Sequence, residues 1–158
     1  MARDEQAITA AVEQSAALLT GAGFARMPAR VLMTLLVAES GLTAVELSET
    51  LGASAAAISG AVRYLQNFGL IRRVSSPGSR RDRYEMPDDA WYSTMAKNSP
   101  LYGALGALAE AAATAMDDAD SHAARRVDEM ARFYRYLEKR MPAIIEEWET
   151  ERRQRPAK

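Results

Sequence analysis

Several residue types that enzymes and secreted proteins depend on are missing or scarce in this 158-residue chain. It has no cysteine, which excludes disulfides, thiol redox chemistry and zinc sites built on cysteine. It has a single histidine, His122, so no histidine pair is available for catalysis or for a metal. We interpret His122, at the start of a predicted helix, as a surface or capping residue.

Long apolar segments are also absent. The chain has no run of about 18 uncharged apolar residues, so no membrane-spanning helix is predicted. The charged residues Arg3, Asp4 and Glu5 are not followed by the apolar core of a signal peptide. We therefore expect a cytoplasmic protein with no membrane partner.

Motifs for catalysis and for metal binding are missing as well. There is no Gly-x-Ser-x-Gly turn and no glycine-rich phosphate loop. Asp117, Asp118 and Asp120 form a cluster, but the glycine and the distal glutamate of a calcium loop do not follow it. We interpret the cluster as a solvated break between helices, and expect no enzyme activity, no metal and no cofactor.

The formal net charge of −1 hides an uneven distribution. Residues 61–85 contain six arginines and two acidic residues, a net charge of +4, whereas residues 86–120 have a net charge of −5. A focused basic patch is a better indicator of contact with phosphates than the net charge of a chain.

The basic segment coincides with the pattern of a winged helix-turn-helix. Helical spacing of apolar residues is interrupted at Gly52 and ends at Gly69, and two β-like runs then flank an arginine-rich turn. In such a unit the second helix can enter a major groove, while the hairpin contacts the adjacent backbone or minor groove. The predicted elements are helices over about 42–51 and 54–68 and strands over 70–74 and 83–86.

Two helices are predicted before this unit. Residues 4–20 show the spacing of an amphipathic helix, and Pro28 suits the first turn of a second helix that extends to about Ala38. The predicted buried positions are Ile8, Val12, Ala16 and Leu19 in the first helix and Val31, Leu32, Leu35 and Leu36 in the second.

Three helices are predicted after the winged unit. A short one follows Pro87 to about Lys97, and Ser99 and Pro100 are expected to cap and begin the next. The last helix carries a 4-3 apolar repeat typical of a helix–helix seam, with Pro142 inside it, where we expect a kink or a restart. The repeats are Leu101, Leu105, Leu108, Ala112 and Ala115, and then Ala123, Val127, Met130, Tyr134, Leu137, Met141, Ile144 and Trp148.

These flanking helices carry more apolar surface than a small winged core can cover. We expect a homodimer in which the terminal helices of two chains interlock, a state that a twofold DNA reader also requires. The alternative is a monomeric bundle. The predicted parts are a dimerisation helix over 1–22, a winged helix-turn-helix over 23–87, and connecting and dimerisation helices over 88–158. The predicted interface residues are Ile8, Val12, Val127, Met130, Tyr134, Leu137, Met141, Ile144 and Trp148.

The order and spacing of the motifs over residues 23–86 resemble the MarR family of bacterial transcription regulators, more closely its GbsR-like branch. The resemblance implies a mainly α fold with a small β-hairpin wing, and a homodimer that binds short inverted repeats of double-stranded DNA. It also implies a small-molecule effector. The matching motifs are RMPARVL at 26–32, LTAVELS at 42–48, LGAS at 51–54, GLIRRV at 69–74 and PGSRRD at 77–82.

The second helix of the unit departs from the family by opening with alanines. Alanine can touch a thymine methyl group but cannot form hydrogen bonds with base edges, so shape readout through the wing is expected to carry more of the specificity. Arg63 is the best candidate on this helix for a phosphate or guanine contact. The predicted buried stripe of the helix is Ile58, Ala61, Val62, Leu65 and Phe68.

The wing places Arg80 and Arg81 at its tip, where they can reach a narrow minor groove. Asp82 is expected to pair with Arg80 or Arg83. Because side chains alternate along a strand, only one of Arg72 and Arg73 is expected to face the DNA backbone. The predicted DNA-binding residues are Ser54, Ala55, Ala56, Ser59, Arg63, Arg73, Arg80, Arg81 and Arg83.

The segment 88–102 is rich in large side chains, and we interpret Trp91, Tyr92, Met95 and Tyr102 either as effector-binding residues or as core. The overall prediction is a sequence-specific transcriptional regulator, and a repressor because a compact dimer on an operator blocks polymerase. The alternative is a winged-helix adaptor that binds proteins and not DNA. The arginine-rich wing favours DNA, because an adaptor needs no basic tip.

Overall fold

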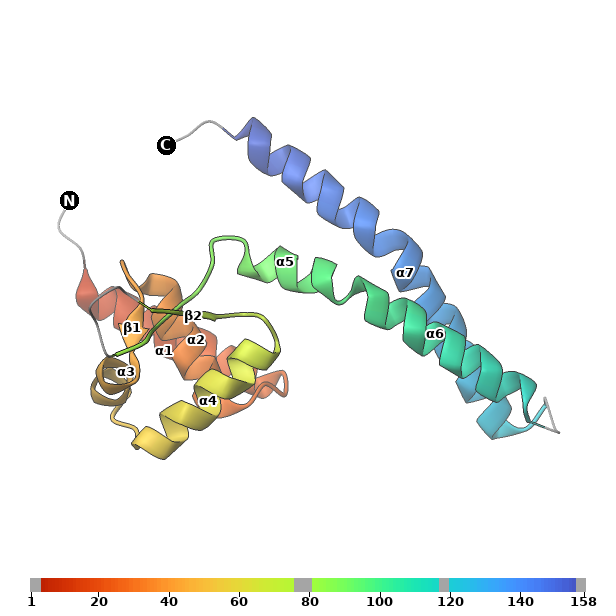
Figure 1. The fold of residues 1–158 in the computed structure, drawn as a ribbon, viewed down its shortest axis with the longest axis horizontal. Coiled ribbons are helices and arrows are strands. Elements are labelled where there is room, and N and C mark those ends of the chain that lie inside the picture. The colour runs from red at the N-terminus through yellow and green to blue at the C-terminus, as the bar shows by residue number, and fades with distance from the viewer. Residues whose placement is uncertain (1–3, 76–80, 117–119, 156–158) are drawn as a thin grey trace. The chain divides into compact units, whose positions relative to one another are not determined.

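A computed structural model describes residues 4–75, 81–116 and 120–155 of the chain (Figure 1). Arg80 of the wing tip, and Asp117 and Asp118 of the acidic cluster, therefore lie outside the described residues. The chain divides into two compact units, Met1–Trp91 and Tyr92–Lys158, each with its own internal packing.

The first unit contains four helices and a small sheet, and the second unit consists of helices. This confirms the predicted mainly α fold with a small β wing. The first unit comprises α1 (Glu5–Gly21), α2 (Arg26–Val37), β1 (Leu42–Thr43), α3 (Ala44–Leu51), α4 (Ala55–Asn67), β2 (Arg72–Val74) and β3 (Arg83–Glu85). α5 (Ala90–Lys97) contains the boundary, and α6 (Ser99–Thr114) and α7 (His122–Gln154) follow.

The core of the first unit lies where α2, α3 and α4 meet, and α1 packs along α2. Its largest fully buried side chains are Leu32, Leu47, Ile58, Leu65 and Val31. Val12 and Ala16 of α1 are buried in the same core, and Ile8 is partly buried against it. The first helix thus has a partner within its own chain.

Two positions predicted to be buried are not. Leu36 and Phe68 each keep 49% of their surface exposed. Phe68 is the residue that caps the C-terminus of α4, so it leaves the helical stripe, and its ring lies against Tyr64 with a centroid distance of 4.8 Å. Leu36 is the penultimate residue of α2, next to the buried Leu35.

The wing belongs to a three-stranded antiparallel sheet of order β1-β3-β2 and is not a free hairpin. The prediction that a helix begins at Leu42 was wrong, because Leu42 and Thr43 form β1 and the helix starts at Ala44. A Thr-x-x-Glu capping box, formed by Thr43 and Glu46, marks this start and could have located it in the sequence. Gly41 allows the strands to approach, since a Cβ there would lie 3.0 Å from the Tyr84 carbonyl oxygen.

In the second unit α6 lies along the N-terminal half of α7 (Figure 1). The face of α6 that meets α7 is made of Gly103, Gly106 and Ala109. A Cβ at Gly106 would lie 3.1 Å from Arg135 Cδ, so the small residues leave room for long α7 side chains. Arg135 uses that room to bind Glu110 through two hydrogen bonds of 2.9 and 2.7 Å.

One expectation for the C-terminal helices was wrong. The N-cap of α6 is Asn98 and not Ser99, although Pro100 does lie in the first turn. α7 continues as one helix of 33 residues through Pro142, which excludes a restart there, and the kink expected as the alternative stays a prediction. His122 is the exposed first residue of α7, as predicted for a surface position. None of the described helices is long and apolar enough to cross a membrane.

Candidate nucleic-acid interface

The turn between α3 and α4 is held from several sides. Gly52 adopts the left-handed conformation (φ 59°, ψ 36°) that ends α3, and the Ser48 hydroxyl donates a 2.5 Å hydrogen bond to the Ala53 carbonyl oxygen. Ser54 then caps α4, accepting a hydrogen bond from the Ala57 N–H, which confirms its predicted role as the N-cap. These contacts fix the direction in which α4 leaves the turn.

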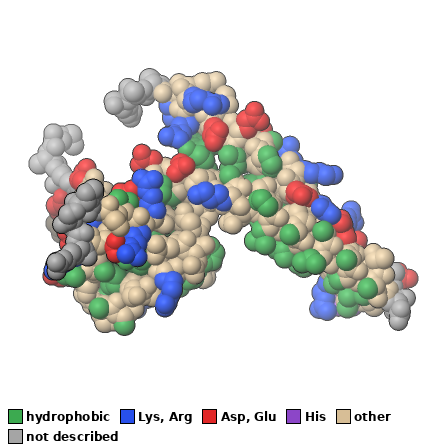
Figure 2. Space-filling model, viewed as in Figure 1, with side chains coloured by type: hydrophobic (Ala, Val, Ile, Leu, Met, Phe, Trp, Pro, Cys, Tyr) green, Lys and Arg blue, Asp and Glu red, His purple; other side chains and the backbone are tan. Residues whose placement is uncertain are grey.

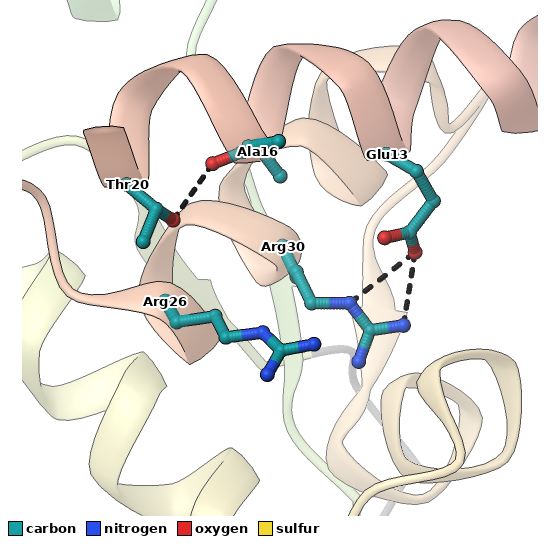
Figure 3. A pocket seen from close by; sticks show the side chains of 6 residues that line it. Glu13, Ala16, Thr20, Arg26 and Arg30 are labelled. Atoms are coloured by element: carbon teal, nitrogen blue, oxygen red, sulfur yellow. Dashed lines mark hydrogen bonds and ion pairs between the residues drawn. The ribbon is translucent and has the colours of Figure 1, made fainter. Parts of the chain in front are cut away.

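Arg30 of α2 supports the same turn from a groove between α1 and α2 (Figure 3). Its guanidinium binds Glu13 through hydrogen bonds of 3.2 and 2.9 Å and also donates to the carbonyl oxygen of Leu51, at 3.3 Å. Arg30 therefore ties α1 to the end of α3. It does so in a shallow groove that is also lined by Arg26 and Thr20.

The outward face of α4 carries small side chains in its N-terminal half, then Arg63, with Gln66 and Asn67 exposed at its C-terminal end. Ile58, Ala61, Val62 and Leu65 are buried on the other side of the helix. Within the described part of the chain, the Arg63 side chain makes no hydrogen bond or ion pair, and it is exposed. An unpaired cation on a face without bulky neighbours is available to a phosphate or a guanine. The other predicted α4 contacts, Ala55, Ala56 and Ser59, are all exposed beside it.

The arginines of the wing are largely paired with acidic residues. Arg72 lies 2.5 Å from Glu85, and Arg73 lies 2.5 Å from Asp82. Asp82 also accepts a hydrogen bond from Ser75, and these two partners lower the pKa of its carboxyl. The prediction that Asp82 pairs with Arg83 was wrong, and Arg80 lies outside the described residues.

These wing pairs are exposed, which decides what they can do. Arg72 and Arg73 keep 64% and 57% of their side-chain surface, so alternation along β2 does not bury either one. Exposed ion pairs contribute only about 0–1 kcal/mol, so a DNA phosphate can replace a carboxylate as the partner of such an arginine. Arg81, just before β3, is exposed as well.

Arg83 has a structural role that the sequence does not reveal. Its Nε donates a 2.6 Å hydrogen bond to the Gly41 carbonyl oxygen, and its guanidinium lies 3.3 Å from Glu46. Arg83 therefore connects the wing to the N-terminus of α3. Its predicted contact with DNA stays a prediction.

Charges of both signs are interspersed on the face of the molecule shown in Figure 2, where blue and red side chains lie close together. The pairs of Arg72 with Glu85 and of Arg73 with Asp82 lie within residues 61–85 and are already counted in its net charge of +4, so only the pairing of Arg83 with Glu46 reduces that excess. The unpaired Arg63 and the exchangeable arginines of the wing are the cations that remain for DNA.

The contacts of the Glu46 carboxylate with Thr43 and Arg83 predict that the stability of the protein depends on pH. The backbone N–H of Thr43 is the main cause that lowers the pKa of Glu46 below its ordinary 4.5, with contributions from the Thr43 side chain and Arg83. As the pH falls, the unfolded chain takes up this proton first, so the contribution of Glu46 is present above about pH 4.5 and is lost below it. Glu46→Gln should therefore destabilise the protein more at about pH 7 than at about pH 3.

Urea denaturation of both proteins at both pH values measures this difference. Because the wild type and the variant share every other carboxylate, the remaining acid effects cancel. A loss of stability that is the same at both pH values would show that the charge of Glu46 contributes nothing.

The predicted effector residues are partly engaged in packing. Within the second unit, Tyr92 meets Trp148 edge to face at 6.3 Å and accepts a hydrogen bond from Arg152, and Tyr102 stacks on Tyr134 at 6.2 Å. Trp91 and Met95 are exposed. The two tyrosines are therefore half-buried and pack on residues of α7, and effector binding stays a prediction for all four residues.

The predicted dimer seam of α7 divides into two sets. Val127 and Tyr134 are half-buried and Met141 is buried within the second unit. Met130, Ile144 and Trp148 are exposed, together with Phe133. Leu101 and Leu108 are exposed on α6. Much of the surface of this apolar set therefore stays exposed on both helices, although the Trp148 ring also contacts Tyr92. Leu137 has the same position in the repeat as Met130 and Ile144, but it is half-buried.

No three acidic or histidine side chains come together as a metal site anywhere in residues 4–75, 81–116 and 120–155. The groups that α4 and the wing present to a ligand are hydrogen-bond donors, cations and small apolar side chains.

Comparison with known proteins agrees with the resemblance to the MarR family, without assigning the chain to the GbsR-like branch. Residues 22–82 match the model of the MarR family, and residues 89–151 match that of the MmpR5-like MarR family transcriptional regulators. The HTH-type transcriptional regulator MmpR5 of Mycobacterium tuberculosis is 30% identical over 128 residues, covering 80% of this chain and 78% of that protein. A crystal structure of a transcriptional regulator matches with a TM-score of 0.79 at 27% identity, covering 90% of this chain and 98% of the other.

Proposed function

The chain belongs to the MarR family of transcriptional regulators. We propose that it forms a homodimer and regulates transcription, with α4 and the wing of each protomer binding duplex DNA. The observation that carries this proposal is the outward face of α4. That helix is capped by Ser54, is joined to α3 by a hydrogen-bonded turn, and presents small side chains beside the unpaired guanidinium of Arg63. Such a face fits a major groove.

The proposal includes a twofold operator and repression. A homodimer presents two copies of α4, so its operator is an inverted repeat with half-sites about 10 bp apart, centre to centre. A compact dimer on that site acts by excluding polymerase. Selecting bound sequences from a random duplex pool tests the symmetry and the spacing together, and a reporter gene behind the selected site distinguishes repression from activation.

The salt dependence of binding tests the DNA contacts. Arg63→Ala and Arg81→Ala should each weaken binding, and each should flatten the slope of log K against log salt by about 0.9 if the arginine contacts a phosphate. If Arg63 contacts a guanine instead, Arg63→Ala should leave the slope unchanged and relax the specificity at one base pair, with a loss of about 1–3 kcal/mol of binding free energy.

Arg132→Ala, at an exposed position of α7, is the matched control and should bind like the wild type. Wild-type affinity in both the Arg63 and the Arg81 variant would exclude this face as the interface. A wild-type protein that shifts no duplex at any salt concentration would instead favour the protein adaptor.

A ligand response and membership of the GbsR-like branch are finer parts of the proposal. The ligand response rests on Trp91 and Met95, whose exposed apolar surface is open to a small molecule. A ligand changes operator affinity only through unequal affinity for two states of the protein. Thermal-shift screening of a metabolite panel against the wild type and Trp91→Ala tests this, and no compound that both stabilises the protein and changes operator affinity would refute it.

A further inference from the structure

Gly60 is the sixth of the thirteen residues of α4, and no contact with the described residues requires a glycine there. A Cβ built at this position would meet no atom within 4 Å. Its backbone does not adopt positive φ, in contrast to Gly23, Gly52 and Gly69. After proline, glycine is the residue that most weakens a helix interior, so its presence here lowers the stability of α4 without any gain in packing.

The glycines of α6 show what a structural requirement looks like. At Gly103 a Cβ would collide with the carboxylate of Glu138, and at Gly106 it would press against the side chain of Arg135. Long side chains of α7 therefore occupy the space that these two glycines leave. Gly60 has no such neighbour among the described residues, so we look for its role outside the chain.

The position of Gly60 on the helix indicates where to look. It follows Ala56 by four residues and precedes Arg63 by three, so the three lie on one face. The buried residues Ile58 and Leu65 belong to the opposite face. Gly60 is therefore at the centre of the outward face, between an alanine and the unpaired arginine.

We propose that Gly60 is a specificity-determining contact, at which the bare backbone of α4 comes against the floor of the major groove. This inference rests on the proposed DNA binding. A methyl group at this point would hold the helix axis away from the bases and withdraw Ser59 and Arg63 from their edges. Non-specific binding depends on phosphate contacts and does not need the helix to enter the groove deeply. The added methyl group should therefore lower the affinity for the operator and leave the affinity for random DNA unchanged.

The test compares Gly60→Ala with the wild type on the duplex that the wild type selects from a random pool, and on a random duplex of the same length. Gly60→Ala should melt about 2–4 °C higher, because alanine strengthens the helix. Its affinity for the selected duplex should fall by about tenfold or more, while its affinity for the random duplex stays within about twofold. Gly60→Leu should lose the preference for the selected duplex altogether.

Gly21→Ala is the matched control, because Gly21 is also helical and also has no atom within 4 Å of a built Cβ. It should keep wild-type affinity for both duplexes. A Gly60→Ala protein that binds the selected duplex like the wild type, or one that melts lower than the wild type, would overturn the inference. A wild type that binds no duplex would instead overturn the proposed function, so the two failures are distinguishable.

Discussion

Phe133→Asp combined with Ile144→Asp is expected to convert the protein from a dimer to a monomer and to abolish operator binding. Both side chains are exposed in the protomer, by 55% and 44% respectively, so the substitutions leave the α6–α7 packing intact. We propose that the exposed apolar residues of α6 and α7 form the dimer interface, in which each new carboxylate would be buried without a partner at a cost of roughly several kcal/mol. A monomer presents only one recognition helix and loses the gain in affinity from linking two of them, so the affinity for the operator should fall by about 100-fold or more.

Sedimentation at micromolar concentration and circular dichroism measure the two effects separately. The variant should sediment as a monomer and keep the helical signal of the wild type. Thr150→Asp, which adds one carboxylate at an exposed polar position of α7, is the control and should remain dimeric. If the double variant stays dimeric, the exposed apolar residues of α6 and α7 are not the interface, and α1 is the next candidate.

Leu65→Ala is expected to destabilise the first unit by about 2–5 kcal/mol, the usual range when a buried leucine is truncated and a cavity remains. Leu65 is fully buried and belongs to the face of α4 that packs on α2 and α3. Because a domain has only about 5–15 kcal/mol of stability in total, the melting temperature should fall by roughly 10 °C or more. The recognition helix would lose its main anchor, so operator binding should weaken at temperatures where the wild type still binds.

Urea denaturation with circular dichroism measures the loss. Leu18→Ala is the matched control, because Leu18 lies on α1 with 77% of its surface exposed, and its change should stay within about 0.5 kcal/mol. Equal losses for the two variants would contradict the core assigned to this unit.

Much of the helix-turn-helix follows from local signals. The turns at Gly52 and Gly69 use a left-handed conformation that glycine adopts without strain, and the stripe from Ile58 to Leu65 has the helical period. Such signals lie within a few residues of the element that they specify. The helices were therefore predictable within a few residues, and the family resemblance was visible from the spacing of short motifs.

What the sequence did not reveal depends on residues that are far apart along the chain. β1 exists because two residues pair with β3 some forty positions later, and Arg83 is drawn to Gly41 and Glu46 by the same pairing. The arginines of the wing read as a block of positive charge, yet three of them form ion pairs, Arg72 with Glu85, Arg73 with Asp82 and Arg83 with Glu46 of α3. The single 4-3 repeat of α7 likewise divides into residues that pack within the second unit and residues that are left exposed.

The candidate site shows the same division. The charge of residues 61–85 and the small residues at the start of α4 were evident from composition, because they require no knowledge of the neighbours. Which arginine is unpaired, and that Gly60 has open space around it, depends on the three-dimensional surroundings of each side chain. Periodicity assigns a residue to a face of its helix. Whether that face is covered or exposed depends on the other elements that pack against it, and their positions are set only by the tertiary fold.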